Sequence, residues 1–185
     1  MSEIEALRQR VEALEIRLRA SEDVLAIQRL KSRYAQLVDA RTPRSGDLPQ
    51  DEIDVIARRI AALFSEDGVW EGGDSLGTGR GRDEIFEILR HPGLRFTWHY
   101  FMKPDIEVTG DRARGRWDIL APCTSKEGRA LWMAGVEHDE YVREGGIWLH
   151  ARMQLELVFM ASYENGWAAR DEIAKGSRGG KSDRT

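Results

Sequence analysis

The stretch DEYVREGGIWLHARMQLELVFM, residues 139 to 160, decides the fold class. Two runs rich in aromatic, β-branched and long apolar side chains flank Gly145-Gly146, a glycine pair that favours the tight turn of an antiparallel hairpin. Runs of the same kind precede this hairpin, and turn segments at Lys103-Pro104, Gly110-Asp111 and 126–128 separate them. The sequence therefore predicts an antiparallel meander with strands at 96–102, 105–109, 113–121, 130–143 and 147–160.

Helical patterns dominate the chain before the meander. Ser21 is a candidate N-cap for a helix that ends near residues 39 to 40, and amphipathic patterns indicate further helices at 51–63 and 83–89. A short strand is expected at 69–71. Helices followed by an antiparallel meander predict an α+β fold in which the helices pack on one face of a curved sheet.

A separate apolar seam marks the first twenty residues. Its members recur at alternating spacings of three and four among Glu and Arg, the pattern of a short coiled-coil helix: Ile4, Leu7, Val11, Leu14 and Leu18. An apolar seam of this kind is normally buried against another part of a protein, and two interpretations remain open. The helix packs on its own domain, or it is an arm that docks on another subunit.

Composition excludes several classes of partner. The chain has 185 residues, with 28 Lys and Arg against 32 Asp and Glu and a net charge of -4, so no basic excess is present to attract nucleic acid. The single cysteine, Cys123, cannot form an intrachain disulfide, and no apolar run approaches the length of a membrane span, about 18 residues. We expect a cytoplasmic protein without membrane or nucleic-acid partners.

Local motifs for cofactors or nucleophiles are weak. The glycine-rich GTGRGR at 77–82 lacks the spacing of a phosphate-binding loop, and the four histidines show no HxH or HExxH spacing. No serine stands in a GxSxG elbow. The sequence therefore signals no metal, nucleotide or covalent catalysis, and we expect no cofactor.

Alternation assigns the faces of the strands, because residues two apart share one side of a sheet. The core side of the last strand is predicted to carry Leu149, Ala151, Met153, Leu155, Leu157 and Phe159. His150 and Arg152 would then point outward. The core side of the strand at 113–121 and its continuation is predicted to carry Trp117, Ile119, Ala121 and Cys123. His99 shares a face with Thr97 and Phe101, and alternation leaves open whether it is a base or a structural core residue.

Six ordered pieces of the chain resemble the SnoaL-like group of the nuclear transport factor 2-like superfamily. They are LKSRYAQLVDA, ALFSEDGVWEG, GRDEIFEIL, WHYFMKPDIEV, GRWDIL and DEYVREGGIWLH, within residues 22–166. The implied fold is an α+β cone-shaped barrel, a bent antiparallel sheet wrapped by N-terminal helices around an apolar pocket. We therefore divide the chain into a helical arm at 1–21, a SnoaL-like domain at 22–166 and a disordered tail at 167–185.

The resemblance also implies a site. Members such as hexachlorocyclohexane dehydrochlorinase, bile-acid 7α-dehydratase and scytalone dehydratase place an Asp-His pair in the pocket. The matching residues here are Asp39, in RYAQLVD, and His99, in WHYFMKP, while Tyr34 matches a functional tyrosine of the bile-acid enzyme. The substrate is expected to contact Trp70, Phe101, Trp117, Ile119, Met153, Leu155 and Leu157.

Two charges of these relatives have no counterpart at the matched positions. A further acid of the bile-acid enzyme falls near Ala121, and a cation on the last strand falls at Met153 or Leu157. The pocket is therefore expected to lack both charges, and its substrate or leaving group should differ from theirs. Asp39 also lies off the apolar stripe of its helix, so its inward position rests on the resemblance.

The implied activity is that of a cofactor-independent lyase acting on a hydrophobic aromatic or polycyclic molecule. His99 would remove a proton, Asp39 would orient it and stabilise the imidazolium, and Tyr34 would donate to a leaving hydroxyl or an oxyanion. Dehydratase-type β-elimination, carbon–carbon cleavage and isomerisation all use such a base. The contrasting interpretation is a non-catalytic module for small-molecule binding or oligomerisation, in which the three residues form a buried polar cluster. A homodimer or homotrimer is expected.

Overall fold

The computed structural model describes residues 2–73 and 76–168. The first half contains α1 (Glu3–Ala40), α2 (Gln50–Ala61), β1 (Phe64–Glu71), β2 (Thr78–Arg80) and α3 (Gly81–Leu89). The second half contains β3 (Phe96–Thr97), β4 (Tyr100–Thr109), β5 (Arg112–Thr124), β6 (Ala130–Glu144), β7 (Ile147–Ser162) and the 3-10 helix η1 (Gly166–Ala168). The predicted tail lies outside the described residues, apart from residues 167 and 168. Within the described part, no helix has the length and apolar character of a membrane span.

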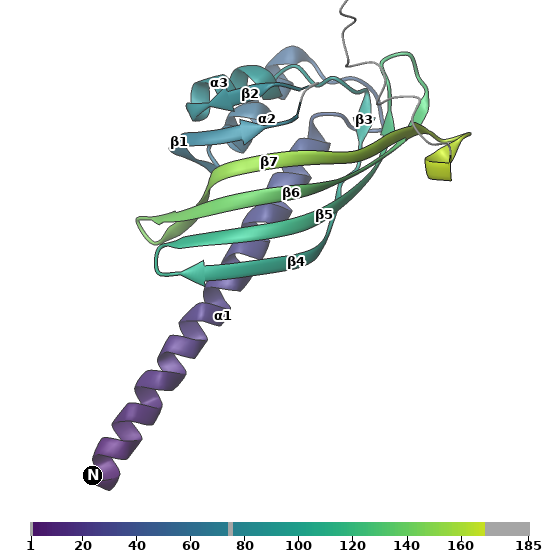
Figure 1. Cartoon of the computed structure of the whole chain (residues 1–185). Coiled ribbons are helices and arrows are strands. Elements are labelled where there is room, and N and C mark those ends of the chain that lie inside the picture. Colours follow the sequence, from purple (N-terminus) through teal and green to yellow (C-terminus); the bar gives the residue numbers. More distant parts are fainter. Residues whose placement is uncertain (1, 74–75, 169–185) are drawn as a thin grey trace, which may run out of the picture.

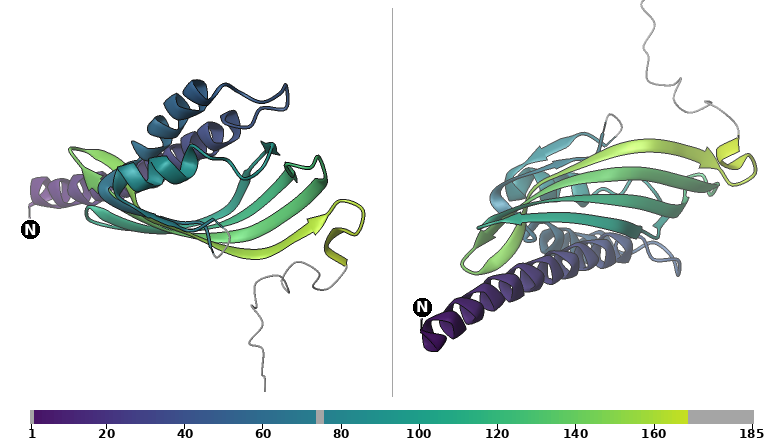
Figure 2. Two further views of the ribbon diagram at one scale, coloured as in Figure 1. Left: turned by 90° about the horizontal axis from the view of Figure 1, so that it is seen from above. Right: turned by 60° about the horizontal axis from the view of Figure 1, so that its bottom comes forward.

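One curled sheet forms the body of the molecule. Its strand order is β2-β1-β7-β6-β5-β3, and β4 also pairs with β5. The β1–β7 pair is parallel, and the other described pairs are antiparallel. Figures 1 and 2 show α1 running along the concave side of the sheet, with α2 and α3 near β1 and β2. The predicted α+β cone is confirmed.

Several predicted boundaries differ from the structure, two of them because a residue expected to end or begin an element lies inside one. The helix α1 runs without a break through Ser21, whose hydroxyl donates to the carbonyl of Arg17 inside the helix instead of capping a new one. Lys103-Pro104 lies within β4 as an irregularity, with Lys103 at φ 50°, and does not form a turn. In both places the residues on either side belong to the same helix or strand. Ser21 and Lys103-Pro104 therefore do not mark the ends of elements, although serine and proline often do.

His150 is fully buried in the core, so its predicted outward direction is wrong. The pairing of β6 with β7 shifts by one residue at Ala151. A β-bulge of this kind inverts the alternation of side chains along a strand. The buried side therefore carries Trp148 and His150 before the bulge and Met153 after it.

A buried ion cluster fastens α1 to the sheet. The ammonium group of Lys31, a residue 1% exposed, donates to the carboxylate of Glu137 and, at 2.7 Å, to that of Asp139, both on β6. The Tyr141 hydroxyl donates to Asp139 at 2.7 Å and accepts the indole N–H of Trp117 at 3.0 Å. Burial alone lowers the pKa of Lys31, but the carboxylates of Asp139 and Glu137 outweigh burial and raise that pKa. The lysine is therefore charged and paired in the core.

Removal of this cation should destabilise the fold strongly. Lys31→Met leaves two carboxylates buried without their partner, so we expect the free energy of unfolding to fall by about 3–5 kcal/mol. Urea unfolding followed by circular dichroism measures the change. Lys103→Met is the matched control, because Lys103 pairs with Asp118 at the surface and its loss should have little effect. Equal losses for the two variants would contradict this account.

His150 should make stability sensitive to acid. Neither ring nitrogen has a hydrogen-bond partner among the described residues, and burial lowers the pKa of His150 from 6.5 to about 3, against the attraction of Asp139. Below pH 6.5, His150 binds a proton in the unfolded chain but stays neutral in the folded chain. The free energy of unfolding therefore decreases as the pH falls from 6.5 towards 3. Between pH 7 and pH 5, we expect the free energy of unfolding of the wild type to fall by about 2 kcal/mol more than that of His150→Phe.

Urea unfolding at a series of pH values checks this difference. The exposed His91 supplies the control, since His91→Gln should follow the pH dependence of the wild type. Parallel curves for the wild type and His150→Phe would show that the buried ring is not held neutral.

Candidate active site

Asp39 meets the edge of the sheet where α1 ends. β3 and β4 both pair with β5, and the backbone N–H of Trp98 donates to Pro122 of that strand. The N–H of the next residue, His99, turns the other way and donates to both carboxylate oxygens of Asp39, at 3.0 and 3.2 Å. The carboxylate thus accepts the hydrogen bond that a neighbouring strand would otherwise accept from this N–H. This contact holds Asp39 against the sheet, although the residue lies off the apolar stripe of its helix.

The side chains of Asp39 and His99 form a direct pair. Asp39 Oδ1 and His99 Nδ1 lie 2.5 Å apart, and the two side chains are 10% and 11% exposed. A carboxylate accepts hydrogen bonds, so it holds the proton on Nδ1 and leaves the lone pair on Nε2. Nε2 has no hydrogen-bond partner among the described residues, and it is not completely buried. The imidazole is therefore oriented, and its proton-accepting nitrogen remains open.

Neighbouring side chains hold this pair in place. Thr97 Oγ1 donates to Asp39 Oδ1 at 3.5 Å and lies 3.0 Å from Thr42 Oγ1. The ring of Phe101 lies almost parallel to the imidazole of His99, with 6.1 Å between the ring centres. Contacts on both sides thus restrict the rotation of the imidazole, as a positioned base requires.

Tyr34 lies in the same interior, near Phe101. The centres of their rings are 6.3 Å apart, and the Tyr34 hydroxyl accepts the indole N–H of Trp70 at 2.9 Å. Burial raises the pKa of Tyr34 far above its ordinary value of 10.0, so the hydroxyl keeps its proton. Among the described residues no acceptor takes this proton. The hydroxyl can therefore donate to a bound molecule.

The seven residues expected to contact a substrate fall into different surroundings. An apolar cluster beside His99 includes Phe101, Ile119 and Leu155. The larger core around Tyr34 includes Trp70 and Met153. Trp117 is buried beside the ammonium group of Lys31, and Leu157 is 45% exposed. The structure thus brings three of the seven into one apolar surface beside the Asp-His pair.

The interior carries a buried acid and a buried cation at positions that the sequence analysis did not single out. The positions matched to the relatives' charges are apolar, but Lys31 of α1 and Glu137 of β6 bring both signs from other elements. Lys31 Nζ lies 4.4 Å from the centre of the Phe101 ring, which also adjoins His99. Burial raises the pKa of Glu137, while Lys31 opposes that rise.

A signal for these charges was present in the sequence. Lys31 stands four residues after Ile27 and three before Tyr34, on the apolar stripe of the helix, and both neighbours are buried. Glu137 and Asp139 are two residues apart and so share one face of their strand with the buried Tyr141. When a helix and a strand each carry ionisable residues of opposite charge at positions predicted to be buried, those residues are expected to form ion pairs with each other.

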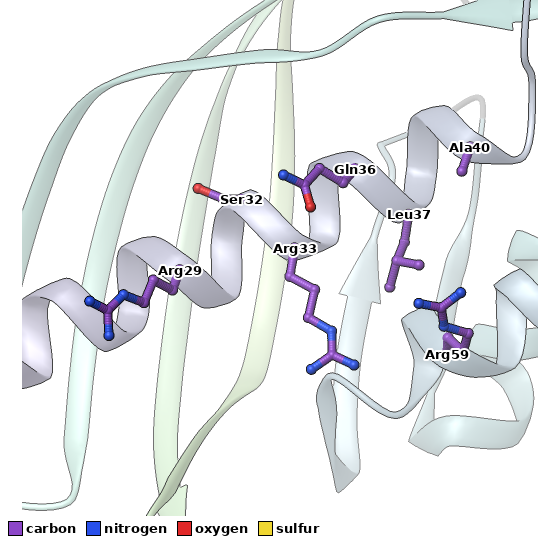
Figure 3. A pocket seen from close by; sticks show the side chains of 7 residues that line it. All are labelled: Arg29, Ser32, Arg33, Gln36, Leu37, Ala40 and Arg59. Atoms are coloured by element: carbon purple, nitrogen blue, oxygen red, sulfur yellow. The ribbon is translucent and has the colours of Figure 1, made fainter.

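Two hollows of the described surface lie away from the pair. The larger one, about 560 Å³, is on the solvent side of α1 and is lined by Arg29, Ser32, Arg33, Gln36, Leu37, Ala40 and Arg59 (Figure 3). The other, about 420 Å³, is lined by Ile4, Leu7, Arg8, Val11 and Glu12. Within residues 2–73 and 76–168, no group of three His, Cys, Asp or Glu side chains could hold a metal ion. Neither hollow is lined by Asp39 or His99.

Comparison with known proteins adds a family and a fold. The model of the SnoaL-like domain matches residues 56–154, more than half of the chain, whereas no curated protein matches the sequence. A hexachlorocyclohexane dehydrochlorinase, LinA-type3 from Novosphingobium barchaimii LL02, is 21% identical with a TM-score of 0.61, covering 87% of this chain and 94% of that one. A candidate scytalone dehydratase from Novosphingobium aromaticivorans DSM 12444 is 22% identical with a TM-score of 0.61, covering 83% and 91%.

A third solved structure is a protein of unknown function from Mycobacterium tuberculosis. It is 25% identical with a TM-score of 0.57, covering 73% of this chain and 71% of that one. These similarities agree with the cone built from α1 and the curled sheet, and the resemblance predicted from the sequence is confirmed. The chain belongs to the SnoaL-like domain family.

Proposed function

We propose that this protein is a cofactor-independent lyase that eliminates a small group, such as water, from a hydrophobic ring-containing molecule. The observation that carries the proposal is the 2.5 Å contact between Asp39 and His99 Nδ1, with Nε2 left open. The names of two similar structures, a dehydrochlorinase and a candidate dehydratase, support an elimination. The same pair would be unnecessary for binding alone, because a neutral apolar ligand is held by burial of its surface.

Proton removal falls to His99. Its Nε2 accepts a proton from the carbon next to the one that carries the leaving group, and the electron pair of that C–H bond forms the new double bond. The leaving group departs from the neighbouring carbon with its own bonding pair. Asp39 stabilises the imidazolium that forms, because its carboxylate accepts the Nδ1 proton throughout. Such a positioned base contributes about 10²–10⁴-fold to the rate.

Tyr34 supplies the acid side of the reaction. A departing hydroxide needs a proton or a strong hydrogen bond, and the Tyr34 hydroxyl keeps its proton in the buried interior. Both Tyr34 and His99 adjoin the ring of Phe101. A substrate that covers Phe101 would therefore reach the base from one side and the donor from the other.

The apolar surface beside the pair favours a flat or polycyclic substrate. Phe101, Ile119 and Leu155 supply apolar contact area, and Lys31 Nζ lies 4.4 Å from the centre of the Phe101 ring. Gly135 adjoins this surface, and a Cβ there would lie 2.8 Å from the carbonyl oxygen of Glu156, 3.0 Å from Leu155 and 3.1 Å from Ile119. We infer binding mainly by burial, with orientation supplied by His99 and Tyr34.

Activity should depend on both members of the pair. Purified protein is incubated, without added cofactor, with benzylic alcohols, hydroxysteroids and diaryl propanediols, and products are identified by mass. We expect His99→Ala to lower kcat/KM by about 10²–10⁴-fold and Asp39→Asn by at least about tenfold, because each removes or disorients the base. His91→Ala, at an exposed histidine, should keep wild-type activity.

Added imidazole distinguishes chemistry from misfolding, because it should partly restore the activity of His99→Ala. Product mass separates loss of water from isomerisation and from release of a one-carbon fragment. If wild type and both variants bound ligands equally but turned none over, the lyase proposal would fail and the binding module would stand.

Tyr34→Phe tests the acid role separately. We expect kcat to fall by about tenfold or more for substrates that lose hydroxide, with little change in KM and a smaller effect where the leaving group is chloride. Tyr163→Phe, at an exposed tyrosine, is the matched control. An equal loss for both leaving groups would argue against proton donation by Tyr34.

A further inference from the structure

Residues 2–21, the described part of the arm, project from the domain and are not covered by it (Figure 1). Asp23 is where α1 becomes tied to the sheet, since its carboxylate accepts from Arg143 Nη1 at 2.6 Å and from Trp148 Nε1 at 2.9 Å. Before Asp23, the seam of Ile4, Leu7, Val11, Leu14 and Leu18 is 48–68% exposed. The interpretation in which the helix packs its seam on its own domain is therefore wrong.

The seam follows a heptad pattern with β-branched residues at its first two a positions and leucine at both of its d positions. Ile4, Val11 and Leu18 occupy the a positions, and Leu7 and Leu14 occupy the d positions. β-branched residues at a with leucine at d favour two-stranded parallel coiled coils. After a polar d position at Ser21, the pattern reaches a further a position at Leu25, which is 50% exposed.

The position of the seam around the helix leaves room for a partner. The buried side of α1, which carries Ile27, Lys31 and Tyr34, lies about 170° around the helix axis from the seam, at 3.6 residues per turn. A second helix can therefore lie along the seam without meeting the sheet of the first chain. The folded domain already holds α1 from Asp23 onward, so the costly first turn of the helix exists before any pairing.

Charges beside the seam identify the partner as a second copy of this chain. In a parallel pair in register, each g position faces the e position of the following heptad on the other helix. The three pairs so formed are opposite in sign on both sides of the seam: Glu3 with Arg8, Arg10 with Glu15, and Arg17 with Glu22. An antiparallel pair that keeps the seam aligned would bring Arg10 against Arg17 and would keep only the pair of Arg8 with Glu15 opposite in sign. We propose that residues 3–25 of two copies form a parallel, in-register, two-stranded coiled coil.

Disulfide trapping in the full chain tests the geometry. Leu7→Cys places a thiol at a d position, where two copies in parallel register bring it beside itself, and Gln9→Cys places one on the far side as the matched control. The native Cys123 is buried and does not interfere. Under mild oxidation we expect Leu7→Cys to form a covalent dimer and Gln9→Cys to form much less. Equal cross-linking of both variants, or none at position 7, overturns the proposal.

Charge reversal tests the pairing of the helices. Arg10→Glu or Glu15→Arg alone sets like charges at two places in the dimer, so we expect the dissociation constant from sedimentation equilibrium to rise by about tenfold or more. A mixture of the two variants should restore tight association, because only the mixed dimer pairs opposite charges. No recovery in the mixture, a monomer at all concentrations, or an assembly of three chains would each refute a two-stranded parallel coil.

Discussion

The buried contact of Lys31 with Glu137 and Asp139 is the constraint on which the rest of the structure depends. Three ionisable groups inside a protein are tolerated only when their charges meet, since an unpaired buried charge costs several kcal/mol. This requirement sets how α1 lies on β6. Tyr34 and Asp39 follow Lys31 along the same helix, so the contact also determines where the two residues reach the sheet.

The candidate site forms where this helix ends against an edge of the sheet. An edge strand presents unpaired backbone groups, and here the N–H of His99 is satisfied by the Asp39 carboxylate. The same carboxylate then orients the imidazole. One side chain thus satisfies the N–H at the edge of the sheet and also orients the proposed base. The fold alone would not imply this chemistry, because related folds also serve only to bind.

Continuity of α1 joins the site to the arm. The helix spans 38 residues, about 57 Å at 1.5 Å per residue, and has no break between the seam and Asp39. One side of its C-terminal half is buried against the sheet, while its N-terminal half keeps an apolar seam in solvent. The single helix therefore carries both the proposed contact between subunits and two of the three proposed catalytic residues.

The α+β class, most strands of the meander and the inner face of β5 could be predicted from the amino-acid sequence. Alternation is regular where pairing is regular, and it placed Trp117, Ile119, Ala121 and Cys123 correctly. The resemblance to the family also pointed to Asp39 and His99. The inward direction of His150 could not be predicted in this way, because a bulge at Ala151 depends on the neighbouring strand. The tertiary structure was also needed to show that α1 passes through Ser21 and that Lys31 finds two carboxylates 106 and 108 residues away. Contacts at such separation arise from how the elements pack, which the local pattern of any one segment does not contain.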